Sequence, residues 1–366
     1  MILQNRLVST LLELIRIDSP TGHEEAIARD LVARLKALGL VVAQDATGNV
    51  IARLDGTGKY RSDAPLLLSA HMDTVGTDTG IQPIVEAGII RSDGTTILGA
   101  DDKSGLSVIL EVLQALSTAG LAHPPLEVVF TVGEEEGLVG AKALDLGQLR
   151  AREGVVLDSG GPIGTVIVSA PYQDKLFVTV HGRAAHAGTE PERGINAIRV
   201  AAEAVAAMPL GRIDEETTAN VGLIRGGVAT NIVPDKVEWH SEARSREEVK
   251  LIAQMQAMRA ALEEAAARHK ATLDLQQERS YDGFSLPPET PIVKRAVAAI
   301  EALDLAPLLL PSGGGSDANV LNSGGITTIN LSTGMAEVHT VKENIAIEDV
   351  VQSARLLLRI VAPARV

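Results

Sequence analysis

The stretch Gly99-Ala100-Asp101-Asp102-Lys103-Ser104-Gly105 decides the fold, because it sets two carboxylates at a turn between an apolar segment and a helical one. We expect a short strand at Thr95 to Leu98 and an amphipathic helix at Ser104 to Leu116. Four further segments bring metal-ligating side chains to the expected ends of strands, namely His71 with Asp73, Glu134 to Glu136, Asp158, and His339. Together the five segments predict a hydrolase that uses two metal ions.

Composition limits the partners of the chain. At 366 residues and 45% apolar content, the length favours about two domains with a substantial core. Three Phe, three Tyr and one Trp leave few side chains on which bases could stack, and the net charge of −14 repels phosphate backbones and anionic lipid. We therefore expect neither a nucleic-acid partner nor a membrane partner.

The absence of cysteine excludes disulfides, thiolate zinc sites and thiol nucleophiles, so any metal ligands must be His, Asp or Glu. The N-terminal residues lack a basic leader, and Glu13 and Arg16 interrupt the apolar stretch before it could serve as the core of a signal peptide. The sequence has no run of about 18 apolar residues, so it does not predict a transmembrane helix. These observations predict a cytoplasmic protein.

Apolar strands alternate with helical segments in the first part of the chain. A Thr-x-x-Glu pattern at Thr21 to Glu24 predicts a capping box at the start of a helix. A hairpin is expected around Gly48-Asn49, and the apolar runs Pro65 to Ala70, Leu126 to Val132 and Val155 to Asp158 have the composition of strands buried on both faces. This alternation predicts a mixed, largely parallel sheet with helices on both sides.

The pattern changes near residue 172. The following segments predict the order βαββαβ, with strands at Leu176 to Val180, Asn220 to Arg225, Lys236 to Ala243 and Thr272 to Gln276, and helices at Asn196 to Ala207 and Arg246 to His269. A Ser245-to-Glu248 capping box is expected to open the second helix. The order describes an inserted ferredoxin-like unit. The predicted domains are residues 1–171 and 284–366, forming the catalytic domain in two parts, and residues 172–283 as a lid or dimerisation domain.

His71 and Asp73 are a candidate ligand and its orienting partner. A metal-bound His usually needs an acceptor that fixes its tautomer, and residues two positions apart face the same side of an extended chain. This pattern alone leaves a surface histidine beside a turn aspartate as an equal alternative. Asp101 can bridge two cations about 3.5–4 Å apart if the backbone turns sharply before Asp102. Alternatively, Asp102 could simply be a carboxylate at a helix N-terminus, where the positive end of the helix dipole favours negative charge. That explanation does not account for the other four segments.

Glu134, Glu135 and Glu136 place three like charges directly after an apolar strand. A solvated acidic turn is the ordinary explanation of such a run. The shared end of the sheet favours instead a division in which one Glu binds metal and its neighbour takes a proton from metal-bound water. Asp158 and His339 would complete a set of oxygen and nitrogen ligands.

In this order, all five segments resemble the dinuclear zinc exopeptidases of the peptidase T, carboxypeptidase and aminoacylase superfamily, over nearly the whole chain. The nearest likeness is to the peptidase T-like branch, in which a Glu-Glu pair follows Phe-Thr-x-x, as in Phe130-Thr131-Val132-Gly133-Glu134-Glu135. The resemblance implies a three-layer α/β/α zinc-exopeptidase core with the ferredoxin-like insertion. It also implies two divalent metal ions, with zinc as the first choice and cobalt or manganese as alternatives. It also implies a cis peptide bond between Asp101 and Asp102. The implied roles are His71 and Asp158 on one metal, Glu135 and His339 on the other, Asp101 as the bridge, Glu134 as general base and Asp73 as the orienter of His71.

The inserted unit carries its own candidate residues. In similar enzymes a His at the position of His186 stabilises the oxyanion, while an Asn and an Arg at the positions of Asn231 and Arg244 bind polar ends of the substrate, often in the neighbouring subunit's site. The loop with Gly313 and Gly314 is similar to one that lets a peptide backbone approach. By themselves these residues are ordinary loop and surface residues, and the glycines fit a flexible linker. The resemblance therefore implies a homodimer formed through the inserted unit.

The resemblance favours removal of the N-terminal residue from short peptides, as by a tripeptidase-like aminopeptidase. Asp at position 158 accompanies aminopeptidases in these families, whereas Glu accompanies carboxypeptidases and deacylases. Carboxypeptidase and N-acyl amino acid amidohydrolase activities remain alternatives with the same metal centre, and a non-catalytic binding relative is a third. Gly133 replaces a carboxylate that often precedes the Glu pair in peptidase T, which leaves tripeptide specificity open.

Overall fold

A computed structural model describes residues 1–362, which form two compact units. The first unit contains Met1–Val168, Ser285–Pro311 and the described residues from Ser316 onward. The second contains Ser169–Phe284 and the short loop Ser312–Gly315. The second unit is therefore inserted into the chain of the first, and a piece of the C-terminal part returns to it.

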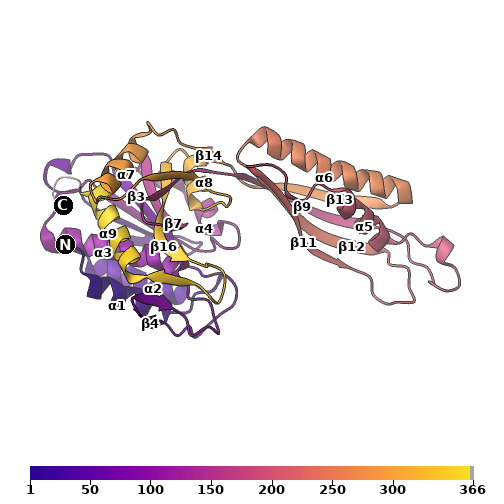
Figure 1. The fold of residues 1–366 in the computed structure, drawn as a ribbon, viewed down its shortest axis with the longest axis horizontal. Helices are drawn as coiled ribbons and strands as arrows, with labels where there is room; N and C mark the ends of the chain where they lie inside the picture. The colour runs from indigo at the N-terminus through magenta and orange to yellow at the C-terminus, as the bar shows by residue number, and fades with distance from the viewer. Residues whose placement is uncertain (363–366) are drawn as a thin grey trace. The chain divides into compact units, whose positions relative to one another are not determined.

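The first unit is built on a mixed sheet (Figure 1). The main path of this sheet runs β1-β2-β6-β3-β7-β16-β17-β5-β4. Its strands are β1 (Val41–Gln44), β2 (Val50–Leu54), β3 (Leu66–His71), β4 (Ile84–Glu86), β5 (Ile89–Arg91), β6 (Leu126–Thr131), β7 (Glu153–Gly160), β16 (Thr327–Ala336) and β17 (Asn344–Ala346), with β8 (Thr165–Ala170), β14 (Phe284–Ser285) and β15 (Leu308–Pro311) branching off. The four central strands β6, β3, β7 and β16 are parallel, and the outer pairings are antiparallel. The central strands are buried on both faces, as their apolar runs predict.

Helices cover this sheet on both sides. They are α1 (Gln4–Ile15), α2 (Glu25–Ala37), α3 (Ala100–Ala119), α4 (Val139–Ala143), α7 (Pro291–Glu301), α8 (Asp317–Ser323) and α9 (Ile347–Val361). In Figure 1, α3 and α9 lie on one side of the central strands, while α4 and α8 lie on the other. Leu, Val, Ile and Ala dominate the continuous core between the layers, in agreement with the shortage of aromatic residues. The three-layer α/β/α architecture is confirmed.

Three local predictions are wrong for reasons of tertiary structure. Thr95 to Leu98 forms no strand, because the Leu98 amide donates to the side chain of Glu343 and not to a neighbouring strand. The capping box at Thr21 does not form, because its hydroxyl donates to the Asp73 carboxylate. Helix α6 begins at Glu248 without a side-chain cap, so the second capping box is absent as well. In the first two cases a polar group found a partner outside its local segment, whereas the Ser245 hydroxyl accepts the amide of Glu247 and pairs with the Thr217 hydroxyl.

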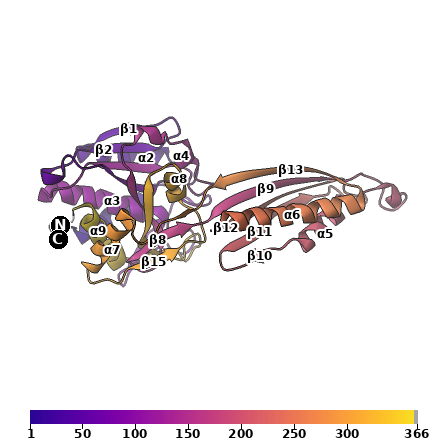
Figure 2. The same ribbon diagram turned by 90° about the horizontal axis from the view of Figure 1, so that it is seen from above.

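The second unit is a five-stranded antiparallel sheet in the order β10-β11-β12-β9-β13, with two helices on one face (Figure 2). Its elements are β9 (Tyr172–His181), α5 (Ala197–Ala207), β10 (Gly211–Arg212), β11 (Thr217–Gly226), β12 (Lys236–Ser245), α6 (Glu248–His269) and β13 (Thr272–Tyr281). Apart from the two-residue β10, the chain order is the expected βαββαβ. Trp239 and its apolar neighbours on alternate strand positions form the core beneath the helices.

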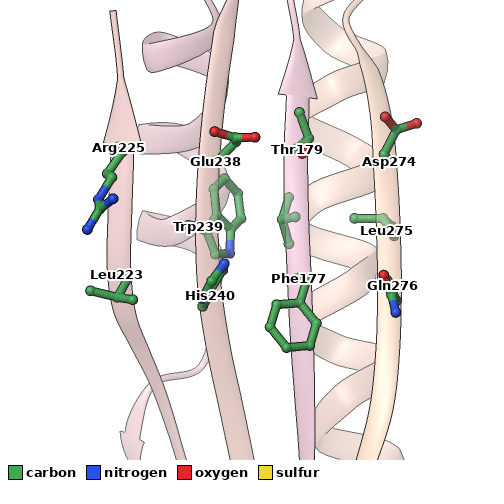
Figure 3. Close-up of a pocket in the computed structure, with 11 residues that line it drawn as sticks. Phe177, Thr179, Leu223, Arg225, Glu238, Trp239, His240, Asp274, Leu275 and Gln276 are labelled. Atoms are coloured by element: carbon green, nitrogen blue, oxygen red, sulfur yellow. The ribbon is translucent and has the colours of Figure 1, made fainter.

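The other face of this sheet is hollowed by a recess lined by residues of β9, β11, β12 and β13 (Figure 3). Phe177 and His240 meet edge to face there, with ring centroids 4.9 Å apart. None of the residues predicted for catalysis or binding lines this recess. This recess therefore does not locate the chemistry of this chain. Among residues 1–362, no helix is both long enough and apolar enough to cross a bilayer.

Candidate metal centre

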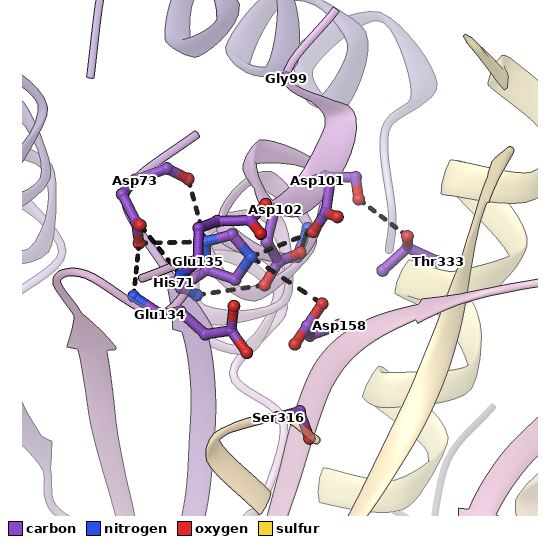
Figure 4. Close-up of polar contacts among 12 residues, drawn as sticks. His71, Asp73, Gly99, Asp101, Asp102, Glu134, Glu135, Asp158, Ser316 and Thr333 are labelled. Carbon is purple, nitrogen blue, oxygen red and sulfur yellow. Dashed lines mark hydrogen bonds and ion pairs between the residues drawn. The ribbon is translucent and has the colours of Figure 1, made fainter. Parts of the chain in front are cut away.

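The predicted metal ligands of the first unit meet where its central parallel strands end (Figure 4). His71 is the last residue of β3, and Asp158 lies near the end of β7. Glu134 and Glu135 follow the end of β6 in a loop that leads to α4. The carboxyl ends of parallel strands share one edge of a sheet, so residues far apart in sequence are brought together here.

Asp101 lies between the two histidines. Its Oδ1 is 3.0 Å from Nε2 of His71, and its Oδ2 is 3.2 Å from Nε2 of His339. The peptide bond between Asp101 and Asp102 is cis, as expected. Both residues have non-helical backbone angles although they open α3, so the sharp turn required of a bridging carboxylate is present.

Two further carboxylates surround this pair. Asp158 Oδ1 is 3.9 Å from Nε2 of His71, and Glu135 Oε1 is 2.9 Å from Nε2 of His339. Glu135 Oε1 is buried and has no hydrogen bond of good geometry, although that ring nitrogen is close. Two side chains that converge without a well-directed hydrogen bond fit a common cation between them. The donor set of carboxylate oxygens and imidazole nitrogens suits zinc and similar divalent ions.

Asp102 also belongs to this cluster, although the sequence analysis gave a ligand role only to Asp101. The ligand atoms of His71, Asp102 and Asp158 lie within 4.8 Å of one another, as do those of His71, Asp101 and Glu135. Both Asp102 oxygens accept backbone hydrogen bonds, from the amide of His71 at 3.2 Å and from that of Gly105 at 3.0 Å. Asp102 thus joins the end of β3 to the start of α3.

Asp73 has a wider role than orienting one ring. The nearest acceptor for Nδ1 of His71 is the backbone carbonyl of Asp73 at 2.9 Å, whereas its carboxylate lies 3.4 Å away. That carboxylate accepts the amide N–H groups of Glu134 and Glu135, at 3.0 and 3.2 Å, and the hydroxyl of Thr21 at 2.8 Å. Asp73 therefore also holds the backbone of the loop that carries the two glutamates.

The buried carboxylates strongly perturb one another. Burial raises the pKa of Glu134, Asp158 and Asp102 well above the usual range, and neighbouring carboxylates raise it further. Burial opposes ionisation of Asp101 too, but hydrogen bonds from His339 and His71 hold its pKa well below the usual range. The nearby carboxylates of Asp101 and Glu135 raise the pKa of His339 to about 10. The cluster carries more negative charge than its two imidazoles can balance, which is the electrostatic condition that favours cations.

Asp317 is a second residue that sequence analysis missed. It is buried at the start of α8, and its Oδ2 accepts the hydroxyl of Thr131 at 2.5 Å. Its Oδ1 is buried without a hydrogen-bond partner. Burial raises the pKa of Asp317 to about 6, and its charge contributes to the raised pKa of Glu134. The only available signal was an Asp after the Gly-Gly-Gly-Ser run, which resembles an ordinary helix start.

The remaining predicted residues lie in the second unit, at opposite ends of its sheet. His186 pairs with Ile232 in a β-bridge, and Ala187 donates to the carbonyl of Asn231, so His186 and Asn231 are neighbours beyond the start of β12. Arg244 lies near the other end of β12, opposite Gln173, close to where the chain enters the unit. Because β12 has 10 residues, the two groups are separated by about 30 Å.

The ring of His186 is held in one tautomer. Its Nδ1 accepts the amide N–H groups of Gly188 and Thr189, each at 3.1 Å. A neutral imidazole that accepts at Nδ1 carries its proton at Nε2. His186 therefore presents a hydrogen-bond donor from an exposed loop.

Arg244 is paired within its own strand. Its Nε and Nη2 donate to the two oxygens of Glu242, at 3.1 Å each. Its Nη1 faces Gly314, where a side-chain Cβ would lie 3.8 Å away, and Gly313 has no atom within 4 Å of such a position. Arg244, Gly313 and Gly314 thus border open space within the second unit.

A carboxylate shared between two histidines at the end of a parallel sheet, with further acidic residues around it, defines a metallohydrolase-type centre. Comparisons with known proteins agree. A model described as "Peptidase dimerisation domain" matches residues 175–270, and one described as "Peptidase family M28" matches residues 49–203.

Whole-chain relatives are found as well. The uncharacterized protein YqjE of Bacillus subtilis is 44% identical over 100% of both chains. The crystal structure of aminopeptidase PepT from Bacillus cereus has a TM-score of 0.89 at 42% identity, covering 99% of this chain and 98% of that one. That of a tripeptidase from Staphylococcus aureus has a TM-score of 0.94 at 39% identity, covering 99% of each chain. The chain belongs to the peptidase T-like members of the M20 peptidase family.

Proposed function

We propose that this chain is a metal-dependent aminopeptidase that removes the N-terminal residue of short peptides. The observation that carries the proposal is Asp101, whose two oxygens lie 3.0 and 3.2 Å from the facing nitrogens of His71 and His339. Two relatives of about 40% identity, described as an aminopeptidase and a tripeptidase, support the direction of cleavage. Asp at position 158 favours the same direction.

His71 and Asp158 would hold one divalent cation, Glu135 and His339 the other, with Asp101 shared. Zinc suits this donor set best. When bound, such ions polarise the scissile carbonyl and make water a better nucleophile near neutral pH. The protein's contribution is to fix the ligands, and Asp73 does so for both His71 and the loop of Glu134 and Glu135.

Glu134 would act as the general base. It is buried beside the cluster, and burial together with the charge of Asp317 raises its pKa, so its carboxylate has a high affinity for a proton. Glu134 would take the proton of the attacking water and give it to the leaving amine, which must be neutral to depart. Glu135, its neighbour on the same loop, would bind metal.

His186 and Asn231 would complete the site of the partner subunit in a homodimer. They lie about 30 Å from the end at which the chain enters the second unit. The Nε2 proton of His186 is suited to an oxyanion, which needs a positioned donor. Arg244, Gly313 and Gly314 would bind the polar end and backbone of the peptide, because Nη1 of Arg244 remains directed toward Gly314.

The dimer would form along β11. Residues Asn220–Gly226 of this strand pair with β12 on one side, and no other described strand covers their outer edge. Leu223 and Ile224 on this edge are 52% and 53% exposed, and Ile198 on α5 is 44% exposed. An unpaired edge with exposed apolar side chains is suited to strand pairing between subunits.

Cleavage of Ala-Leu-Gly tests the activity. The products are identified by mass spectrometry after incubation with zinc-loaded or cobalt-loaded protein, beside a sample treated with chelator. We expect Ala plus Leu-Gly, lost on chelation. Release of Gly plus Ala-Leu would make the chain a carboxypeptidase, and no cleavage would favour acylated substrates or a binding role.

Mixed dimers test the sharing of the site. Glu134→Gln and His186→Ala subunits, each inactive alone, are unfolded, mixed in equal amounts and refolded. If His186 acts across the dimer, about a quarter of the wild-type activity should return, because half of the dimers are mixed and each has one intact site. A mixture as inactive as its parents, with mixed dimers shown by native mass spectrometry, would place His186 in its own subunit's site or outside catalysis.

A further inference from the structure

Glu343 is a buried carboxylate that sequence analysis did not single out. Its exposed fraction is 1%. Its Oε2 accepts the amide N–H groups of Leu98 and Gly99, both at 2.8 Å, and its Oε1 accepts that of Asp101 at 3.0 Å. Three of the four amides in residues 98–101, including that of Asp101 itself, thus converge on a single side chain that lies 242 positions after Asp101 in the chain.

These three amides have no partner of the usual kind. The segment before α3 forms no strand, and the first amides of a helix have no acceptor within the helix. A buried amide without an acceptor is costly, so the conformation of this segment depends on the Glu343 carboxylate. The same segment determines where the Asp101 side chain lies between His71 and His339.

Glu343 also belongs to the segment that carries His339. The two residues are four positions apart in the connection from β16 to β17, and the amide of Glu343 donates to the carbonyl of Thr340. His339 has a φ of +63°, a left-handed conformation that few non-glycine residues adopt without support from their surroundings. One side chain therefore ties the backbone of the shared carboxylate to the backbone that holds a facing histidine.

The charge of Glu343 has a buried counterpart in Lys103. This lysine is fully buried, and its Nζ donates to the carbonyl of Ile17 at 2.7 Å. Burial lowers the pKa of Lys103 to about 8, while the charges of Asp18 and Glu343 favour its ionised form. Burying another carboxylate beside an acidic cluster is unfavourable unless its hydrogen bonds and a cation offset the loss of hydration. An apolar residue could fill the same volume but could not accept the three amides.

We propose that Glu343 is a positioning residue for the metal centre, which holds Asp101 and the His339 segment in the arrangement that shares one carboxylate between two ions. The inference rests on the proposed binding of two divalent cations. Glu343 itself touches neither substrate nor metal. Its effect reaches the site through the backbone at residues 98–101 and through the loop of His339.

The test compares Glu343→Gln with a matched control, Glu127→Gln. Glu127 is equally buried, and its carboxylate accepts the amides of Arg150 and Ala151, at 2.9 and 2.8 Å. It lies at the start of β6, whereas the metal centre lies at the ends of the parallel strands. Loss of the carboxylate charge should therefore weaken folding in both variants but affect metal binding in only one.

Zinc affinity is measured by competition with a chromogenic chelator on metal-free protein, together with the melting temperature, kcat and KM. We expect Glu343→Gln to bind at least one of the two ions about 10–100-fold more weakly, with a lower kcat and nearly unchanged KM. Glu127→Gln should keep the wild-type zinc affinity, although its melting temperature should fall by a similar amount. Glu343→Asp, too short to reach all three amides, should lie between wild type and Glu343→Gln.

Wild-type zinc affinity in Glu343→Gln would overturn the inference, as would an equal loss of affinity in Glu127→Gln. If Glu343→Gln does not fold, hydrogen exchange of the wild-type protein decides. The amides of Leu98, Gly99 and Asp101 should then be strongly protected, and free exchange at these positions would overturn the inference. Wild-type protein that binds no zinc at all would instead refute the proposed function.

Discussion

Asp73→Asn tests whether the carboxylate of Asp73 holds the loop of the two glutamates. The wild-type carboxylate accepts the amides of Glu134 and Glu135 on separate oxygens. Asparagine keeps one oxygen, so it can accept one amide and must turn its own NH2 group toward the other. The substitution therefore removes one charge-assisted hydrogen bond and leaves one buried N–H without an acceptor.

The expected loss follows from these two changes. A hydrogen bond to a charged group contributes about 1.5–3 kcal/mol, and an unpaired buried amide costs about 1–3 kcal/mol. The free energy of unfolding of the metal-free protein should fall by roughly 3–5 kcal/mol, which corresponds to a melting temperature lower by roughly 6–15 °C. Because Glu134 moves with its backbone, kcat should fall by at least about 10-fold.

Calorimetry of chelator-treated protein gives the stability, and a crystal structure of the variant gives the geometry. His71 should keep its hydrogen bond to the backbone carbonyl of residue 73, while the backbone of Glu134 and Glu135 shifts. Asp214→Asn is the control, since Asp214 accepts the amides of Glu216 and Thr217 in the second unit. A melting temperature within about 2 °C of wild type would refute the reasoning, and so would a rotated His71 ring above an unchanged loop.

Three further predictions concern single substitutions. Glu134→Gln should retain both metals and lower kcat by at least about 100-fold; loss of metal, measured by atomic absorption, would exchange the roles of Glu134 and Glu135. Asp317 has a folded-state pKa raised from 3.8 to about 6, so its stabilising proton uptake is complete below about pH 4 and is lost as the pH rises through about 6. Asp317→Asn keeps an acceptor for the Thr131 hydroxyl but carries no charge. The substitution should therefore raise the free energy of unfolding of the metal-free protein, by up to about 3 kcal/mol more at pH 7.5 than at pH 4. Equal effects at both pH values in urea titrations would contradict this prediction. Gly105→Ala would place a Cβ 2.5 Å from Asp102 Oδ1 and closer still to the Leu157 carbonyl, so α3 must shift at a cost of about 1–3 kcal/mol, and an unchanged melting temperature would contradict that packing.

Much of the architecture was predictable because periodicity is a local property. Apolar runs of strand length marked β3, β6 and β7, and the βαββαβ order of the second unit followed from alternating and helical spacing. Since parallel strands end at one edge, ligand residues at several strand ends could be expected to meet. This is why His71, Asp101 and Glu135 could be grouped before their distances were known.

The failures have a common cause. Thr21 was expected to cap a helix and instead donates to Asp73, 52 positions away. The segment before α3 was expected to be a strand, and its amides instead turn to Glu343. Hydrogen-bond partners at such separations leave no trace in local spacing, so propensity alone assigned these groups to their own segments.

The sequence by itself determined the fold class, the inserted unit and the kinds of residue that could bind metal, because these depend on period, composition and the order of strand ends. Only the tertiary structure decided that the Asp101 oxygens lie 3.0 and 3.2 Å from the two histidines, that Asp73 holds the glutamate loop through its carboxylate, and that Glu343 holds the backbone of Asp101. The physical reason is that buried amides and carboxylates must find partners wherever the fold brings them, and those partners lie tens to hundreds of residues away.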